Sequence, residues 1–134
     1  MSRVVLRTGI DILDIDRLNS LAPGIRSRFL KRVFTPRELE RAEDKCSSLA
    51  GLFCVKEAVS KALGCGIGRI GWQEIETLAD AQGAPRVELY GKAATLANEI
   101  GLTTWSVSIS HTKQVAAASV TAVRFILDDE DTLR

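Results

Sequence analysis

The sequence predicts an α+β fold in which an antiparallel sheet is wrapped by helices and one long central helix packs through it. Three features lead to this prediction. In residues 49–64 apolar side chains recur at steps of three and four, which is the spacing of a buried helix face. In residues 104–110 polar and apolar side chains alternate, as in a strand with one buried face. Residues 115–125 then return as a second strand after a short turn.

Length and composition indicate a single folded domain. The chain has 134 residues, 46% of them hydrophobic and 26% charged, so it can bury a core and is not expected to be disordered. We expect one domain over residues 1–126 and an acidic C-terminal tail over 127–134. No segment is long enough to span a bilayer, and the N-terminus lacks the apolar run of a signal peptide, so a cytoplasmic protein without a membrane partner is expected. The three cysteines lack CxxC spacing and predict neither a zinc site nor a disulfide framework.

The N-terminal third is expected to form one strand and two helices. Residues 4–12 are rich in β-branched side chains and predict a strand that carries Asp11 near its end. A carboxylate among apolar neighbours needs a hydrogen bond, a cation or water. A helix over 14–21 has Asp14 as its expected N-cap, and a second helix covers 25–33 with its bases outward. The apolar residues expected to face inward on the second helix are Ile25, Phe29, Leu30 and Val33.

A third helix is expected to begin after Thr35. Thr35 can cap it, Pro36 suits the first helical position, and Glu38 completes a capping box. The helix should extend to about residue 45. Ser47 or Ser48 is then the expected cap of the central helix.

The central helix carries charged side chains beside its apolar face. Lys56, Glu57 and Lys61 lie outside the predicted apolar stripe, and Gly64 is placed to end the helix in a left-handed conformation. Glu57 and Lys61 are four residues apart and share a face, so they predict either a surface ion pair or a carboxylate for a metal beside an ammonium for a phosphate. Spacing alone favours the ion pair, because such pairs are common on solvated helices. The residues of the stripe are Leu52, Val55, Val59, Ala62 and Leu63.

The second half of the chain predicts two hairpins and a helix. The glycine-rich loop 64–71 follows a helix, so it is not a dinucleotide fingerprint, although its amides could approach a phosphate. Strands over 74–79 and 86–90 should be joined by a turn around Gly83, and a helix over 91–100 should follow. The last two strands form a hairpin with His111 and Thr112 at its tip. His111 could serve a ligand or be an ordinary capped turn histidine.

Charge is distributed unevenly along a nearly neutral chain. Residues 23–37 contain five bases and no acid, whereas 128–131 are acidic, and the formal net charge is +1. A local basic patch on such a protein suggests an acidic protein partner rather than nucleic acid, with a solvated helix face as the alternative. The five bases are Arg26, Arg28, Lys31, Arg32 and Arg37.

Four segments, taken together and in order, resemble a known family. They are GIDI at 9–12, FCVKEAVSKALGCGIG at 53–68, GAPRVEL at 83–89 and SISHT at 108–112. They are similar to the holo-acyl-carrier-protein synthases, the short bacterial members of the 4'-phosphopantetheinyl transferase superfamily. The resemblance covers nearly the whole chain. It implies an enzyme that moves 4'-phosphopantetheine from coenzyme A to a serine of apo acyl carrier protein, releasing adenosine 3',5'-bisphosphate, in fatty acid, polyketide or lipid biosynthesis.

The resemblance also implies roles for individual residues. Asp11 and Glu57 would hold Mg²⁺, which prefers carboxylate, phosphate and water oxygens. Lys61 would bind the phosphates of coenzyme A, with Gly64 among the further contacts to this substrate. His111 and Thr112 would also contact coenzyme A. Glu57, directly or through a metal-bound water, is the expected base that takes the proton of the carrier serine, with Asp11 as the second candidate.

Members of the family assemble as trimers with active sites at subunit boundaries, and the acidic helix of the carrier docks on an arginine-rich helix. We therefore expect a homotrimer. Opposite potentials would speed the encounter with the carrier and set its orientation. The matching residues for carrier binding are Arg17, Arg28, Phe29 and Arg32, with Phe53 beside the metal.

Two positions depart from the family pattern. Leu52 occupies a position that is Arg in many members, so a phosphate or structural contact is lost and coenzyme A affinity is expected to differ. Cys54 stands where a small residue such as Ala is usual and can act as a small hydrophobic side chain. Leu52 keeps open an alternative function, a non-catalytic paralogue of the same fold that binds coenzyme A or a carrier protein. A trimeric assembly protein without either ligand is a third possibility, against which the intact set of site residues argues.

Overall fold

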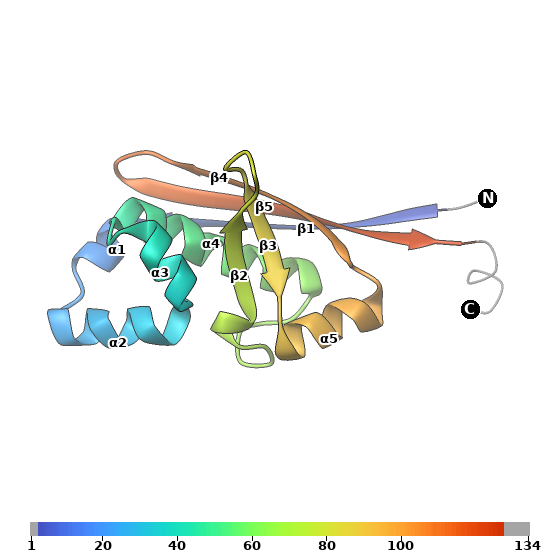
Figure 1. Cartoon of the computed structure of the whole chain (residues 1–134), viewed down its shortest axis with the longest axis horizontal. Coiled ribbons are helices and arrows are strands. Elements are labelled where there is room, and N and C mark those ends of the chain that lie inside the picture. The colour runs from blue at the N-terminus through green and yellow to red at the C-terminus, as the bar shows by residue number, and fades with distance from the viewer. Residues whose placement is uncertain (1–2, 128–134) are drawn as a thin grey trace.

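A computed structural model gives the fold and describes residues 3–127. Its long strands lie along one side of the molecule, and the helices and a short hairpin lie on the other (Figure 1). The predicted α+β class is confirmed. The elements are β1 (Arg3–Asp14), α1 (Asp16–Asn19), α2 (Pro23–Val33), α3 (Pro36–Ala42), α4 (Cys46–Leu63), the 3-10 turn η1 (Trp72–Glu74), β2 (Ile75–Ala79), β3 (Pro85–Leu89), α5 (Gly91–Ile100), β4 (Thr104–His111) and β5 (Val115–Ile126).

The main sheet has three antiparallel strands in the order β1-β5-β4. The central strand β5 pairs with β1 over its whole length, starting at Arg3↔Ile126, and with β4 as far as His111↔Ala116. Strands β2 and β3 form a separate hairpin with Gly83 in the turn. Both predicted hairpins are therefore confirmed. The described part of the chain ends just after β5, and the expected acidic residues 128–131 lie outside it.

Helix α4 is the central element of the core and packs against β1 and β5. The predicted left-handed end at Gly64 is confirmed, with φ of +74°. Gly9 has a steric reason to be glycine: a Cβ there would lie 1.8 Å from the carbonyl oxygen of Ala58. Strand β1 therefore approaches α4 more closely than any side chain at position 9 would allow.

The capping box at Thr35 is confirmed, since its hydroxyl accepts the N–H of Glu38 and the Glu38 carboxylate accepts the N–H of Thr35. Helix α3 is shorter than predicted. It ends at Ala42 because Glu43 and Asp44 both adopt left-handed backbone conformations, with φ of +50° and +59°.

Three local predictions near the helix ends are wrong. Asp14 is the last residue of β1, and the cap position of α1 is Ile15, without a side-chain bond. The cap of α4 is Lys45, so Ser47 and Ser48 lie inside its first turn and not before it. Ile25 is not an inward residue, because half of its surface is exposed.

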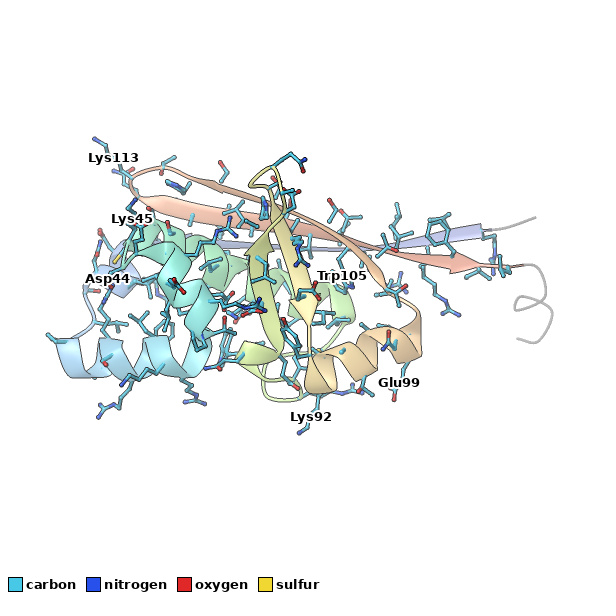
Figure 2. All side chains as sticks on the ribbon, in the orientation of Figure 1. Asp44, Lys45, Lys92, Glu99, Trp105 and Lys113 are labelled. Atoms are coloured by element: carbon cyan, nitrogen blue, oxygen red, sulfur yellow. The ribbon has the colours of Figure 1, made fainter. Side chains whose placement is uncertain are left out.

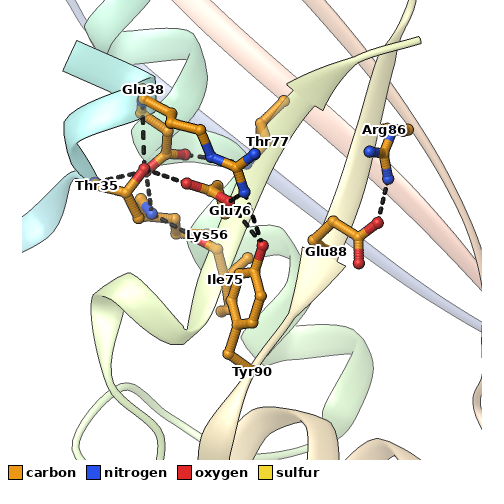
Figure 3. A network of polar contacts seen from close by, with 10 residues as sticks. Thr35, Glu38, Lys56, Ile75, Glu76, Thr77, Arg86, Glu88 and Tyr90 are labelled. Carbon is orange, nitrogen blue, oxygen red and sulfur yellow. Dashed lines mark hydrogen bonds and ion pairs between the residues drawn. The ribbon is translucent and has the colours of Figure 1, made fainter. Parts of the chain in front are cut away.

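Lys56 is also placed differently from the prediction. Its side chain is completely buried, and its Nζ lies 2.7 Å from Oε1 of Glu38, which is equally buried. It also donates to the carbonyl oxygens of Trp72 and Ile75. Burial lowers the pKa of Lys56, and the negative charges of Glu38 and Glu76 oppose this. Figure 3 shows that this pair joins α3 and α4 to the start of β2. An apolar helical pattern cannot reveal such a residue, because burial of a lysine depends on a partner far away in the sequence.

None of the helices within residues 3–127 is long and apolar enough to cross a membrane.

Candidate active site

Two carboxylates meet at the contact between β1 and α4. Asp11 comes from β1 and Glu57 from α4, and both side chains are partly buried. Burial raises the pKa of Glu57, and the negative charge of Asp11 raises it further, whereas Lys61 lowers it. Lys61, which shares a face of α4 with Glu57, pairs with Asp11, so the two carboxylates lie on the same side of the β1–α4 contact although they are 46 positions apart in the sequence. The close approach at Gly9 makes this proximity possible.

Lys61 completes this group, but with a different partner from the one expected from spacing. Its Nζ lies 3.2 Å from Oδ1 of Asp11 and donates to the carbonyl oxygen of Ile10 at 2.8 Å. Its surface ion pair is thus with Asp11 on β1, rather than with Glu57 on its own helix. An ammonium has three N–H donors, so one remains for a ligand.

Cys54 lies beneath the carboxylates. Its side chain is fully buried, and its Sγ is 3.6 Å from the carbonyl oxygen of Ala116. Burial raises the pKa of this thiol to about 12, and Asp11 and Glu57 add to the effect. Cys54 therefore acts as the small hydrophobic side chain that the sequence suggested. It remains an uncharged thiol beside Asp11 and Glu57.

His111 and Thr112 lie at the tip of the β4–β5 hairpin, as predicted, and both are exposed. The Thr112 hydroxyl accepts the N–H groups of Gln114 and Val115, which leaves its own hydrogen free to donate. Strand β4 is one edge of the sheet and β1 is the other, with β5 between them. Within one chain, the predicted site residues Asp11 on β1 and His111 on β4 therefore lie at opposite edges of the sheet.

Three of the residues predicted for carrier binding surround one apolar pocket. Arg17 of α1, Phe29 of α2 and Phe53 of α4 line a hollow of about 190 Å³. The Phe29 and Phe53 rings are 5.9 Å apart, and Phe53 stacks on Trp72 at 5.1 Å. The remaining lining residues are Leu13, Leu18 and Leu21, which the sequence analysis did not single out.

The basic segment is only partly available to a partner. Arg28 and Arg32 are exposed on α2, four residues apart and therefore on one face. Arg26 instead pairs with Asp44 at 2.9 Å, and Arg37 pairs with Glu76 at 2.6 Å. The prediction that the bases of the helix over 25–33 point outward is wrong for Arg26, whose side chain is largely buried.

Comparison with known proteins places this arrangement in a family. The 4'-phosphopantetheinyl transferase superfamily profile matches residues 7–120. The chain belongs to this superfamily. The holo-[acyl-carrier-protein] synthase of Herpetosiphon aurantiacus is 43% identical over 123 residues, covering 87% of this chain and 97% of that protein. The protein of the same name from Moorella thermoacetica is 44% identical over 117 residues, covering 85% of this chain and 91% of the relative.

Solved structures agree with this family assignment. The holo-[acyl-carrier-protein] synthase of Helicobacter pylori in complex with coenzyme A matches with a TM-score of 0.78 and 34% identity. The match covers 86% of this chain and 98% of the other. The synthase from Neisseria meningitidis gives the same TM-score at 31% identity, covering 87% of this chain and 96% of that one. The resemblance to holo-acyl-carrier-protein synthases seen in the sequence is confirmed.

Proposed function

We propose that this protein transfers 4'-phosphopantetheine from coenzyme A to a serine of apo acyl carrier protein and releases adenosine 3',5'-bisphosphate. The observation that carries the proposal is the cluster of Asp11, Glu57 and Lys61 at the β1–α4 contact. In this reaction the serine oxygen bonds to the β-phosphorus of coenzyme A, and the bond from that phosphorus to the bridging oxygen breaks. The serine proton goes to a base, and the bisphosphate leaves.

The donor set fits Mg²⁺. Among residues 3–127 no group of three Cys, His, Asp or Glu side chains is placed to hold a metal. The cluster at the β1–α4 contact contains two carboxylates, Asp11 and Glu57. Mg²⁺ is commonly bound by one or two carboxylates, with waters and phosphate oxygens completing the shell. We infer that Asp11 and Glu57 would hold it. When bound, the metal would neutralise charge on the diphosphate and on the leaving group.

The residues of the cluster, the end of α4 and the hairpin tip each have a distinct role in the proposed reaction. Glu57 takes the serine proton, directly or through a water, and its raised pKa makes it a stronger base than an exposed glutamate. Asp11 is the second candidate base. Lys61 binds the phosphates with its remaining N–H, Gly64 leaves the end of α4 open to the substrate, and His111 and Thr112 contact coenzyme A from the hairpin tip.

We propose a homotrimer in which a neighbouring copy completes the site. His111 and Asp11 belong to opposite edges of the same sheet, so a second chain could bring its hairpin tip to the β1 edge of the first. On the face of the sheet turned away from α4, β1 and the end of β5 expose large apolar side chains, and an exposed apolar patch often marks an interface. The exposed residues that support this are Val4, Leu6, Ile10, Ile12 and Phe125.

The carrier protein would dock on α1 and α2. The apolar pocket between Arg17, Phe29 and Phe53 can receive an apolar side chain, and Arg28 and Arg32 can pair with an acidic helix. Such docking should weaken with added salt. A single catalytic domain over 1–126, a cytoplasmic location and a role in fatty acid or lipid biosynthesis belong to the same proposal.

The proposal is tested by incubating the protein with coenzyme A, Mg²⁺ and a panel of apo carrier proteins. Mass spectrometry should show a carrier heavier by one phosphopantetheine. Glu57→Gln should abolish the transfer with the circular dichroism spectrum unchanged, and Glu99→Gln on α5 is the control for loss of an exposed carboxylate. Coenzyme A binding without transfer to any carrier would indicate the non-catalytic paralogue instead.

A further inference from the structure

The short 3-10 turn η1 contacts both α2 and α4, although the function proposed above gives it no role. It follows the glycine-rich loop and leads directly into β2. Of the elements within residues 3–127, η1 is the one against which α2 packs most closely. Helix α2 is proposed to bind the carrier protein, whereas α4 carries Glu57. The contacts of η1 therefore bear on how a docked carrier is placed relative to Glu57.

Gln73 of η1 caps the end of α2. The last carbonyl oxygens of a helix have no partner within the helix, and the chain leaves α2 in an extended conformation at Phe34, without a left-handed residue that would cap them. The side-chain amide of Gln73 donates to two of these oxygens, that of Lys31 at 2.6 Å and that of Arg32 at 3.4 Å. One side chain thus joins η1 to the turn of α2 that carries Arg32.

Trp72 joins η1 to α4. Its ring stacks on Phe53 with the centroids 5.1 Å apart, and the Phe53 ring lies 5.9 Å from that of Phe29 on α2. The carbonyl oxygen of Trp72 accepts a hydrogen bond of 3.0 Å from the ammonium of Lys56, the residue before Glu57. Because this ammonium is completely buried and also forms an ion pair, η1 is anchored to the core beside the active site.

The first turn of α2 has a separate anchor. Arg26 pairs with Asp44 at 2.9 Å and donates to Sγ of Cys46 at 3.7 Å, so it ties α2 to the start of α4. Asp44 and Lys45 lie at the same end of the molecule as α2 (Figure 2). Helix α2 is thus held at its start by one of its own side chains and at its end by Gln73, and loss of the Gln73 amide should loosen only the last turn.

We propose that Gln73 is a positioning residue for the carrier protein, because it holds the end of α2 in the orientation in which Arg28 and Arg32 can bind an acidic helix. This rests on the proposed function. Gln73 acts through α2 and touches neither the metal nor coenzyme A. When the cap is absent, α2 spends part of its time in orientations that do not bind the carrier, which lowers the apparent affinity by the fraction that remains competent.

The test separates the two substrates kinetically. Gln73→Met keeps the length of the side chain and removes its donor, so KM for the apo carrier should rise about threefold, which corresponds to the net contribution of one hydrogen bond. Because a bound carrier restores the docked orientation of α2, kcat at saturating carrier should not change. KM for coenzyme A and the melting temperature should also stay as in the unmodified protein, since the Glu57 cluster and the core are untouched.

Asn98→Leu on α5 is the matched control, because it too replaces an exposed amide by an apolar side chain of similar size. Figure 2 shows the neighbouring residue Glu99 on α5, away from α2. Every kinetic parameter of this control should equal that of the unmodified protein.

Hydrogen exchange provides a readout that does not depend on transfer. In Gln73→Met the amides of residues 30–34 should exchange faster, whereas those of α4 should not change. Faster exchange with an unchanged KM for the carrier would reduce Gln73 to a structural cap and overturn the proposal. Equal rises in KM for both substrates would also overturn it. So would a raised carrier KM without faster exchange, because Gln73 would then contact the carrier directly.

Failure of the proposed function would be recognised separately, because the unmodified protein would then modify no carrier. Fluorescence anisotropy with a labelled apo acyl carrier protein decides the role of Gln73 in that case. Weaker binding by Gln73→Met than by the unmodified protein would support the positioning role. Equal binding by the two proteins, or no binding by either, would reject it.

Discussion

Cys54 and Glu57 show how one contact sets the chemistry of individual side chains. Both lie where β1 crosses α4, and for both of them burial raises the pKa. For Glu57 the result is a more basic carboxylate that is still partly exposed, which suits the proton transfer proposed for it. For Cys54 it is a thiol that stays protonated at neutral pH. Thiolates rather than thiols react with most reagents, so Cys54 should be inert.

This predicts two classes of thiol. Cys46 and Cys65 are partly exposed, whereas Cys54 is fully buried. At pH 8 a disulfide reagent such as dithionitrobenzoate should label Cys46 and Cys65 in the native protein and Cys54 only after denaturant is added. Peptide mapping would identify the labelled positions. Rapid labelling of Cys54 in the native protein would contradict this prediction, because it would show that the thiol is open to solvent.

At the scale of elements, a buried ionic network fixes α4 beside the β2–β3 hairpin. Glu38 accepts from Lys56 and from the N–H of Thr35 and Thr77, so a single carboxylate joins three elements. Glu76 lies beside it (Figure 3). Glu76 accepts hydrogen bonds from Thr35, Arg37 and Tyr90. Burial alone would raise the pKa of Glu76, but these hydrogen bonds lower it overall. The network holds α4, and hence Glu57, in a fixed orientation.

Breaking the buried pair should therefore be costly. Lys56→Met leaves the Glu38 charge without its partner, and we expect a loss of about 3–5 kcal/mol in the free energy of unfolding. The double variant Lys56→Met/Glu38→Gln should be more stable than Lys56→Met alone, because the uncompensated charge is gone. Urea unfolding at a fixed protein concentration measures both values. A double variant no more stable than the single one would show that the charge of Glu38 is unimportant.

The elements that the sequence predicts correctly are those that depend on local patterns, whereas contacts between distant residues, such as those of this network, are not predicted. The hairpins, α4 with its end at Gly64 and the capping box at Thr35 depend on local patterns, and all are confirmed. The burial of Lys56 cannot be predicted from the sequence, because its partner Glu38 is 18 positions away and no pattern in α4 indicates it. Similarly, Lys61 pairs with Asp11, a contact created by the tertiary approach at Gly9. Only the family motifs predict the site residues, because spacing alone favours an ordinary surface ion pair between Glu57 and Lys61.

At the scale of the whole molecule, the outer face of the sheet exposes large apolar side chains that a second chain could cover. Ile10 and Ile12 of β1 are 67% and 69% exposed, and Phe125 of β5 is 62% exposed, all on the face turned away from α4. A neighbouring copy packed there would bury these side chains. The same packing would have to bring His111 of one chain to Glu57 of another, which makes the trimer and the active site a single prediction.

Mixing two inactive variants tests that prediction. Glu57→Gln removes one half of each site and His111→Ala the other, so each trimer of either variant alone should be inactive or nearly so. If a site takes Glu57 from one chain and His111 from its neighbour, random exchange of subunits at equal ratio leaves about one quarter of the sites intact. Transfer activity should therefore rise from near zero to about one quarter of that of the unmodified protein after denaturation and joint refolding. Because a site built within one chain would always lack one of the two residues, a mixture that stays inactive while sedimentation shows trimers would place both residues in the same subunit's site.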